Sequence, residues 1–171
     1  MKKIAYFGLF LAITLILSYV ESILPAFTPI PGIKLGLANC AVLLILYLYG
    51  PKEAAIINVT RVVLSAFMFN GLYSLMYSLT GALFSFLIMF ALYRKEKTFS
   101  PIGIGMLGGL FHNLGQLLIA FCVTRVKGLV YYVPVLILSG LFTGALIGLI
   151  TRLLLPRLRE VMLKDTKKQE D

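Results

Sequence analysis

Long apolar runs separated by short polar or proline-containing segments constrain this chain more than any other feature. Only 13% of its 171 residues are charged and 60% are hydrophobic, and its mean hydropathy is +0.95. In a soluble domain about a quarter of the residues are charged. Runs of roughly 20 apolar residues match a helix that crosses a bilayer, and such a helix satisfies its own backbone hydrogen bonds in lipid. We therefore predict an all-α membrane protein.

Turn signals such as Gly50-Pro51 and Asn70-Gly71 divide the apolar sequence into six predicted transmembrane helices. Five of these cover residues 4–20, 53–69, 72–93, 101–123 and 130–155. The second helix begins somewhere between residues 33 and 37 and ends at residue 49. We expect residues 1–156 to form one six-helix domain and residues 157–171 to form a charged cytoplasmic C-terminal tail. The basic N-terminus resembles the start of a signal peptide, but no cleavage motif follows before Pro25, so we predict an uncleaved first span.

The distribution of basic residues predicts how the chain is oriented. With six helices, twelve Lys and Arg residues in the loops, tails and helix ends lie on the side of the termini and three lie on the other side. Because segments rich in Lys and Arg stay in the cytoplasm, both termini are expected to be cytoplasmic, in a multi-pass protein of the cell (plasma) membrane. The formal net charge of +9 comes mostly from residues at the ends of apolar runs. Membrane lipid is therefore an expected partner, and nucleic acid is not.

One basic residue, Arg61, lies in the middle of a predicted span. An Arg at the bilayer centre costs roughly 2.5–3.5 kcal/mol on insertion scales, so it should face the protein interior and a partner or ligand there. Asn58 shares its helix face, and His112, Asn113 and Gln116 form a polar stripe on a later span. Two interpretations remain open. The residues form a substrate-binding pocket for an anion or a polar heteroaromatic molecule, or they form hydrogen bonds that only hold helices together.

Further polar residues are expected on the outer side of these groups. Glu21, Lys34 and Asn39 are predicted to lie above them, and Asn39 is a candidate either for the pocket or for an interhelix hydrogen bond. The proline-rich connection of residues 21–34 is long enough to act as a lid. Tyr77 is a candidate for stacking on a ligand, or for an aromatic belt at the membrane interface.

The scarcity of acidic residues excludes several kinds of chemistry. Glu53 is expected at the cytoplasmic boundary of its span and no Asp or Glu inside one, so coupling of transport to protons or sodium is not expected. The sequence has no Asp cluster to hold magnesium-bound diphosphate, and its single His has no neighbouring Cys to form a metal site. It also has no P-loop. We expect no catalysis, no metal and no other cofactor, and energy for uphill transport would have to come from another protein.

The first span carries small residues at helical spacing. Gly8 and Ala12 are four positions apart, and Ala5 lies on an adjoining face. Such a patch lets a second helix approach closely. That helix belongs either to this chain or to an external partner, and the sequence leaves both open. Close packing inside the domain is predicted at two further ridges of small residues, which are Ser74, Ser78, Gly81 and Ser85 on one span and Gly140, Gly144 and Gly148 on another.

Several of these segments together resemble a known family. They are the segment PGIKLGLAN at 31–39, Arg61 with Leu64-Ser65, the segment YSLTG at 77–81 and the segment HNLGQ at 112–116. They resemble the Gx transporter family, which is also labelled heptaprenyl diphosphate synthase component I. The resemblance covers nearly the whole chain.

This family is similar to the substrate-binding S components of energy-coupling factor (ECF) transporters. The resemblance implies a six-helix, vitamin-binding type of bundle whose first connection closes over a substrate that enters from outside. It also implies a coupling subunit driven by an ATPase pair, with Gly8 and Ala12 at the docking patch, although Gly stands where Ala is more usual. The function implied is an S subunit that captures a small anionic, vitamin-like or precursor molecule. A non-catalytic membrane component associated with heptaprenyl diphosphate or quinone synthesis remains the alternative.

Overall fold

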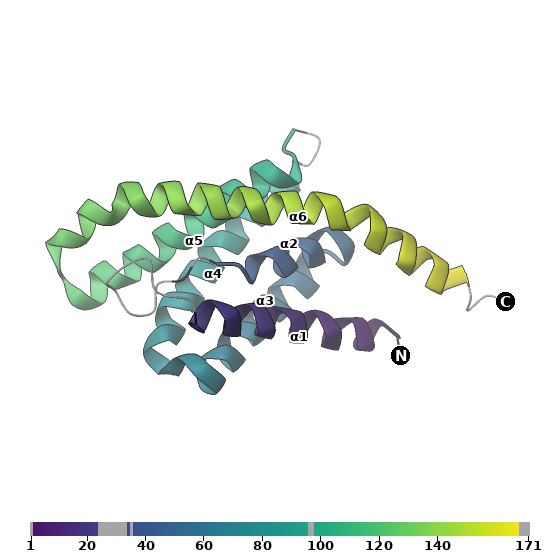
Figure 1. Cartoon of the computed structure of the whole chain (residues 1–171), viewed down its shortest axis with the longest axis horizontal. Coiled ribbons are helices and arrows are strands. Elements are labelled where there is room, and N and C mark those ends of the chain that lie inside the picture. The colour runs from purple at the N-terminus through teal and green to yellow at the C-terminus, as the bar shows by residue number, and fades with distance from the viewer. Residues whose placement is uncertain (1, 24–33, 35, 96–97, 168–171) are drawn as a thin grey trace.

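The described part of the chain is built from helices alone. The computed structural model describes residues 2–23, 34, 36–95 and 98–167, and no strand occurs among them (Figure 1). The α-helices are α1 (Lys2–Ile23), α2 (Asn39–Leu48), α3 (Pro51–Ser65), α4 (Gly71–Tyr93), α5 (Pro101–Thr124) and α6 (Val133–Lys167). A π-helical turn, η1 (Ala66–Asn70), joins α3 to α4, and a 3-10 helix, η2 (Lys127–Tyr132), precedes α6. This confirms the all-helical class.

Four helical stretches are long and apolar enough to cross a membrane. They are residues 4–23, 51–93, 101–124 and 127–164. The second contains a hairpin, because the chain turns at Gly71, whose φ of +74° is accessible to glycine, and α4 then packs back along α3. α2 has 10 residues and is about 15 Å long, half of the roughly 30 Å hydrocarbon core. Six complete crossings therefore stay a prediction.

α2 lies at the centre of the molecule, between α1 and α6 (Figure 1). Its residues Asn39–Tyr47 are all buried. A helix that is apolar around its whole circumference is stable only when other elements surround it. The core accordingly joins α2 to Phe10 of α1, Ile57 of α3 and Ile147 of α6. The short helix thus brings its first residue, Asn39, deep into the bundle.

Glycine brings α5 and α6 into close backbone contact. A Cβ atom added at Gly109 would lie 2.3 Å from the carbonyl oxygen of Gly140, and one added at Gly105 would lie 2.4 Å from that of Gly144. Real Cβ atoms do not approach backbone atoms so closely, so these positions admit only glycine without rearrangement. The ridge predicted on the last span is therefore confirmed as a packing surface.

The predicted ridge of small residues on α4 also packs closely, in this case against α5. Ser74, Ser78, Gly81 and Ser85 are all buried. A Cβ atom at Gly115 of α5 would lie 3.0 Å from the carbonyl oxygen of Thr80 and 3.1 Å from the Cα atom of Gly81. α5 is thus held between α4 and α6, and this position fixes the direction in which its polar stripe points.

Two helices continue further than the predicted spans. α1 continues to Ile23 instead of ending near residue 20, so Glu21 belongs to the helix. α6 continues through Pro156 to Lys167 instead of ending at residue 155. At 35 residues, α6 is about 52 Å long and extends well beyond the thickness of a bilayer core. α1 begins and α6 ends at the same end of the molecule (Figure 1).

Candidate functional site: a buried polar cluster around Arg61

Arg61 of α3 is buried, and two asparagines bind it. Its Nε and Nη2 atoms donate to Oδ1 of Asn58, at 3.2 and 2.9 Å, and Nη2 also donates to Oδ1 of Asn39 at 2.9 Å. Asn58 is itself fixed, since its Nδ2 donates to the carbonyl oxygen of Ala82 at 3.2 Å. Only 4% of Arg61 is exposed. The prediction that this guanidinium faces the protein interior is therefore confirmed, and α2, α3 and α4 hold it there.

Glu21 is the acidic counterpart of this arginine. The side chain is 9% exposed and lies near the end of α1, within an apolar stretch long enough to span a membrane. Its Oε1 atom accepts a hydrogen bond from the backbone N–H of Leu37 at 2.8 Å, and the charges of Arg61 and Lys34 act on its carboxyl group. The expectation that no span contains an acidic residue is therefore wrong. The prolines that follow suggested a loop, whereas the helix continues past the glutamate.

Lys34 lies beside these charges and is half-buried. Its backbone N–H donates to Oε1 of Gln116 on α5 at 3.1 Å. Burial lowers the pKa of the Lys34 ammonium group to about 8, because burial disfavours the charged form. The carboxyl group of Glu21 acts on this pKa in the opposite direction, and the guanidinium of Arg61 lowers it further. Lys34 therefore changes its charge close to neutral pH.

The imidazole of His112 lies between two glycines. A Cβ atom added at Gly36 would lie 2.9 Å from His112 Cδ2 and 2.9 Å from Asn39 Nδ2. A Cβ atom added at Gly81 would lie 3.1 Å from His112 Cε1 and 2.8 Å from Gln116 Cγ. Gly36 also has a φ of +80°, which non-glycine residues rarely adopt. These two glycines were not predicted as site residues, because no local pattern in the sequence reports their contacts with His112.

The described part of this site leaves several buried polar atoms without a hydrogen-bond partner. They are Nδ2 of Asn39, both ring nitrogens of His112 and Nε2 of Gln116. A buried donor or acceptor without a partner costs about 1–3 kcal/mol. A bound molecule that hydrogen-bonds to these atoms would remove that cost. We use the name Arg61 cluster for the seven residues Glu21, Lys34, Asn39, Asn58, Arg61, His112 and Gln116.

Two predicted site residues lie elsewhere. Asn113 points to α6, where its Nδ2 donates to the carbonyl oxygen of Leu136 at 2.9 Å and to Oγ of Ser139 at 3.1 Å. Tyr77 is buried in a second apolar cluster with Ala120, Leu129 and Leu136. Its burial places Tyr77 inside the protein rather than in a lipid-facing belt. Asn113 therefore joins two helices through its nitrogen while its Oδ1 atom is buried without a hydrogen-bond partner, and Tyr77 makes packing contacts.

The predicted docking residues lie on an open face of α1. Ala5, Gly8 and Ala12 are all exposed. A Cβ atom added at Gly8 would meet nothing within 4 Å. Of the two alternatives for this patch, packing against another helix of the described chain is thus contradicted. The predicted lid covered residues 21–34: residues 21–23 belong to α1, and residues 24–33 lie outside the described residues.

Comparison with known proteins supports the resemblance in the sequence. No curated protein and no solved structure gives a significant match to the chain. Residues 10–154 match the family described as heptaprenyl diphosphate synthase component I. This match begins within α1 and ends within α6, so it includes every residue of the Arg61 cluster. The chain therefore belongs to the heptaprenyl diphosphate synthase component I family.

Proposed function

We propose that the chain is the substrate-binding S subunit of an ECF-type importer and that it captures a small anion in the Arg61 cluster. The observation that carries this proposal is the set of buried, unpartnered polar atoms beside a buried guanidinium. Purely structural hydrogen bonding would leave fewer donors unused, since buried polar groups in folded proteins are nearly always paired. A ligand would supply the missing partners.

The charges of the cluster favour an anionic ligand. Two cationic side chains, Arg61 and Lys34, lie near one carboxylate, Glu21. One positive charge is therefore left over when each group carries its ordinary charge. The free amide nitrogens of Asn39 and Gln116 are hydrogen-bond donors. A carboxylate or a phosphate accepts such bonds and would neutralise the remaining charge.

The segment before α2 supports a route for the ligand. Its backbone is tied on one side to Glu21, through the N–H of Leu37, and on the other side to Gln116, through the N–H of Lys34. These two bonds connect α1 and α5 across the segment, which follows directly on the predicted lid. Moving the segment would break these hydrogen bonds, and it would uncover His112, against which Gly36 packs.

Energy for uptake would come from partner proteins, since the sequence contains no P-loop. The exposed small residues of α1 support this arrangement, because a flat helix face admits the close approach of a partner helix. The chain would then be a non-enzymatic subunit of a plasma-membrane complex, together with a coupling subunit and an ATPase pair.

Replacing the guanidinium tests the binding site directly. The purified chain should carry a co-purifying small molecule that native mass spectrometry detects, and Arg61→Ala should lose it. Arg152→Ala is the matched control, because Arg152 is exposed on α6. The gel-filtration profile shows whether each variant is folded. A folded Arg61→Ala protein that retains the same molecule would contradict the proposal.

A second function is favoured by the description of the matched family. The chain would be a non-catalytic membrane component associated with heptaprenyl diphosphate or quinone synthesis. The two functions differ in the proteins that co-purify with the tagged chain from its own membrane. A coupling subunit with two ATPases supports import, whereas a soluble prenyl synthase rich in aspartate supports the second function.

A further inference from the structure

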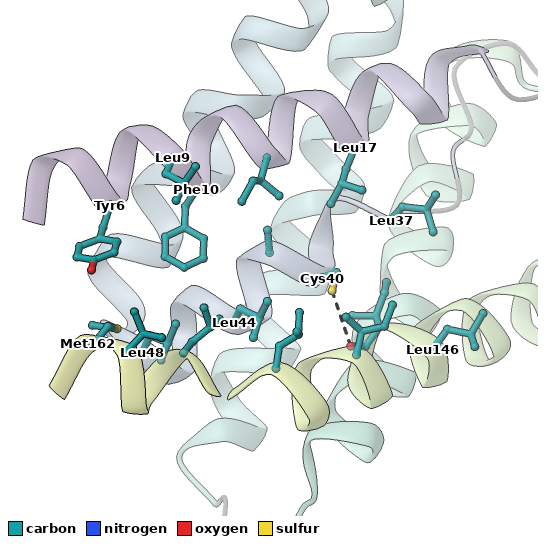
Figure 2. A pocket seen from close by; sticks show the side chains of 17 residues that line it. Tyr6, Leu9, Phe10, Leu17, Leu37, Cys40, Leu44, Leu48, Leu146 and Met162 are labelled. Carbon is teal, nitrogen blue, oxygen red and sulfur yellow. Dashed lines mark hydrogen bonds between the residues drawn. The ribbon is translucent and has the colours of Figure 1, made fainter. Parts of the chain in front are cut away.

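An apolar groove runs between α1 and α6, with α2 as its floor (Figure 2). α1 and α6 do not pack against each other within the described residues, so the two helices form walls that stay apart. The groove has a volume of about 430 Å³. Its lining is apolar apart from the hydroxyl group of Tyr6 and the thiol of Cys40, and no residue of the Arg61 cluster lines it. It is therefore separate from the proposed substrate site.

The groove needs an apolar occupant when the protein is in a membrane. Water fills a buried cavity only where polar groups can bind it, and these walls offer almost none. An empty space would also deprive the lining side chains of contacts on one side. The groove extends from Tyr6 to Leu17 along α1, which is roughly 16 Å at 1.5 Å per residue. One leaflet of the hydrocarbon core is about 15 Å thick, half of the roughly 30 Å core.

Basic residues of α6 lie beside the groove, toward one of its ends. Tyr6 and Met162 mark this end, and Leu17 and Leu146 mark the other (Figure 2). Arg157 follows the lining residue Leu154 by three positions in α6, so it lies on the groove side of the helix. Its side chain is exposed. Lys164, about two turns further on, is exposed and pairs with Glu160 at 2.6 Å.

From this combination we propose that the groove binds one acyl chain of an anionic phospholipid, with the phosphate headgroup against Arg157. The groove length matches an acyl chain of one leaflet, whereas a heptaprenyl chain is considerably longer than the groove. The positive end of the groove selects an anionic headgroup over a zwitterionic one.

Native mass spectrometry of the full chain tests the proposal, with phosphatidylglycerol and phosphatidylcholine as the two probes. The detergent-purified protein should retain one phosphatidylglycerol molecule in preference to phosphatidylcholine. Arg157→Gln should weaken retention of phosphatidylglycerol about fivefold, the change expected for about 1 kcal/mol per basic residue near an anionic lipid. Arg94→Gln, at an exposed arginine beyond α4, should have no effect.

Filling the groove gives an independent check. Ile150→Trp places a large side chain on the groove wall and should abolish lipid retention. Leu149→Trp adds the same bulk at an exposed position that does not line the groove, and should leave retention unchanged. Equal retention of both probes would overturn the proposal. So would displacement of phosphatidylglycerol by a polyprenyl diphosphate at equal concentration, or a dimer that forms through this face and excludes lipid.

Discussion

At the scale of single residues, the charges in the interior are arranged around fixed amide groups. Asn58 accepts two hydrogen bonds from Arg61 and donates to the backbone of α4, so every polar atom of its side chain is used. Asn39 uses its oxygen on the same guanidinium, and its nitrogen is left without a partner. Asn58 therefore acts as a support for Arg61, and Asn39 is the better candidate for direct contact with a ligand.

Lys34 should make anion binding depend on pH. Its pKa of about 8 means that the ammonium group is charged below pH 8 and neutral above it. Glu21 and Arg61 are the titratable groups whose charges act on it. The affinity for the co-purifying anion should therefore fall as the pH rises from 7 to 9. Isothermal titration calorimetry at several pH values measures this change.

Lys34→Met provides the contrast for that measurement. The variant should bind the anion more weakly at pH 7 and should show little further loss up to pH 9, because the titrating group is gone. If the affinity of the wild-type protein stays constant over this pH range, Lys34 does not contribute to anion binding.

Whether the environment of a residue could be predicted depended on the residues next to it in the sequence. Arg61 was identified as buried because apolar residues surround it on both sides. Glu21 precedes several prolines, so its local sequence suggested a loop. In the structure it is buried in α1 and accepts a hydrogen bond from the backbone of Leu37, a contact that the local sequence does not report. Asn113 shares the polar stripe with His112, but the close contact of α5 with α6 turns it toward Leu136.

At the scale of helices, glycine determines how close α5 and α6 come. Gly109→Ala should lower the stability of the fold by about 1–3 kcal/mol, the usual cost of overpacking, because the added methyl group would meet the carbonyl oxygen of Gly140. Gly103→Ala lies on the same helix, and its nearest neighbour would be Ser100 Oγ at 3.9 Å. Thermal unfolding in detergent should show a lower midpoint for Gly109→Ala alone. Equal midpoints would contradict the tight interface.

α2 shows how an element can differ in length from its sequence signal. The apolar sequence suggested a span that begins at 33–37, but the helix starts at Asn39 after a turn at Gly36. Position 36 is occupied by a glycine with positive φ that packs on His112. The turn therefore shortens α2 and places Gly36 against His112. No local pattern in the sequence predicts such a contact.

At the scale of the whole molecule, the three features proposed for function lie on different parts of the bundle. The Arg61 cluster is internal, the groove opens between α1 and α6, and the small residues Ala5, Gly8 and Ala12 form another exposed face of α1. Because these regions share α1, substrate binding and partner docking can influence each other through this one helix.

Docking through the small-residue face is testable with one bulky substitution. Gly8→Leu should reduce the coupling subunit and ATPases that co-purify with the tagged chain, because the larger side chain keeps the partner helix away. Binding of the small molecule to the isolated chain should be unchanged. Ala91→Leu, at an exposed alanine of α4, is the control for added bulk. If the Gly8→Leu variant co-purifies with the same amounts of these partners, the docking surface does not include Gly8.

The sequence by itself determined the helical membrane class, the turns between helices and the burial of Arg61. The physical reason is that lipid offers no hydrogen bonds, so apolar runs become helices and a charge among them turns inward. Only the tertiary structure decided which polar side chains meet. That depends on how far each helix is rotated about its axis and how closely it approaches its neighbours, and here the glycine contacts of α5 with α4 and α6 set both.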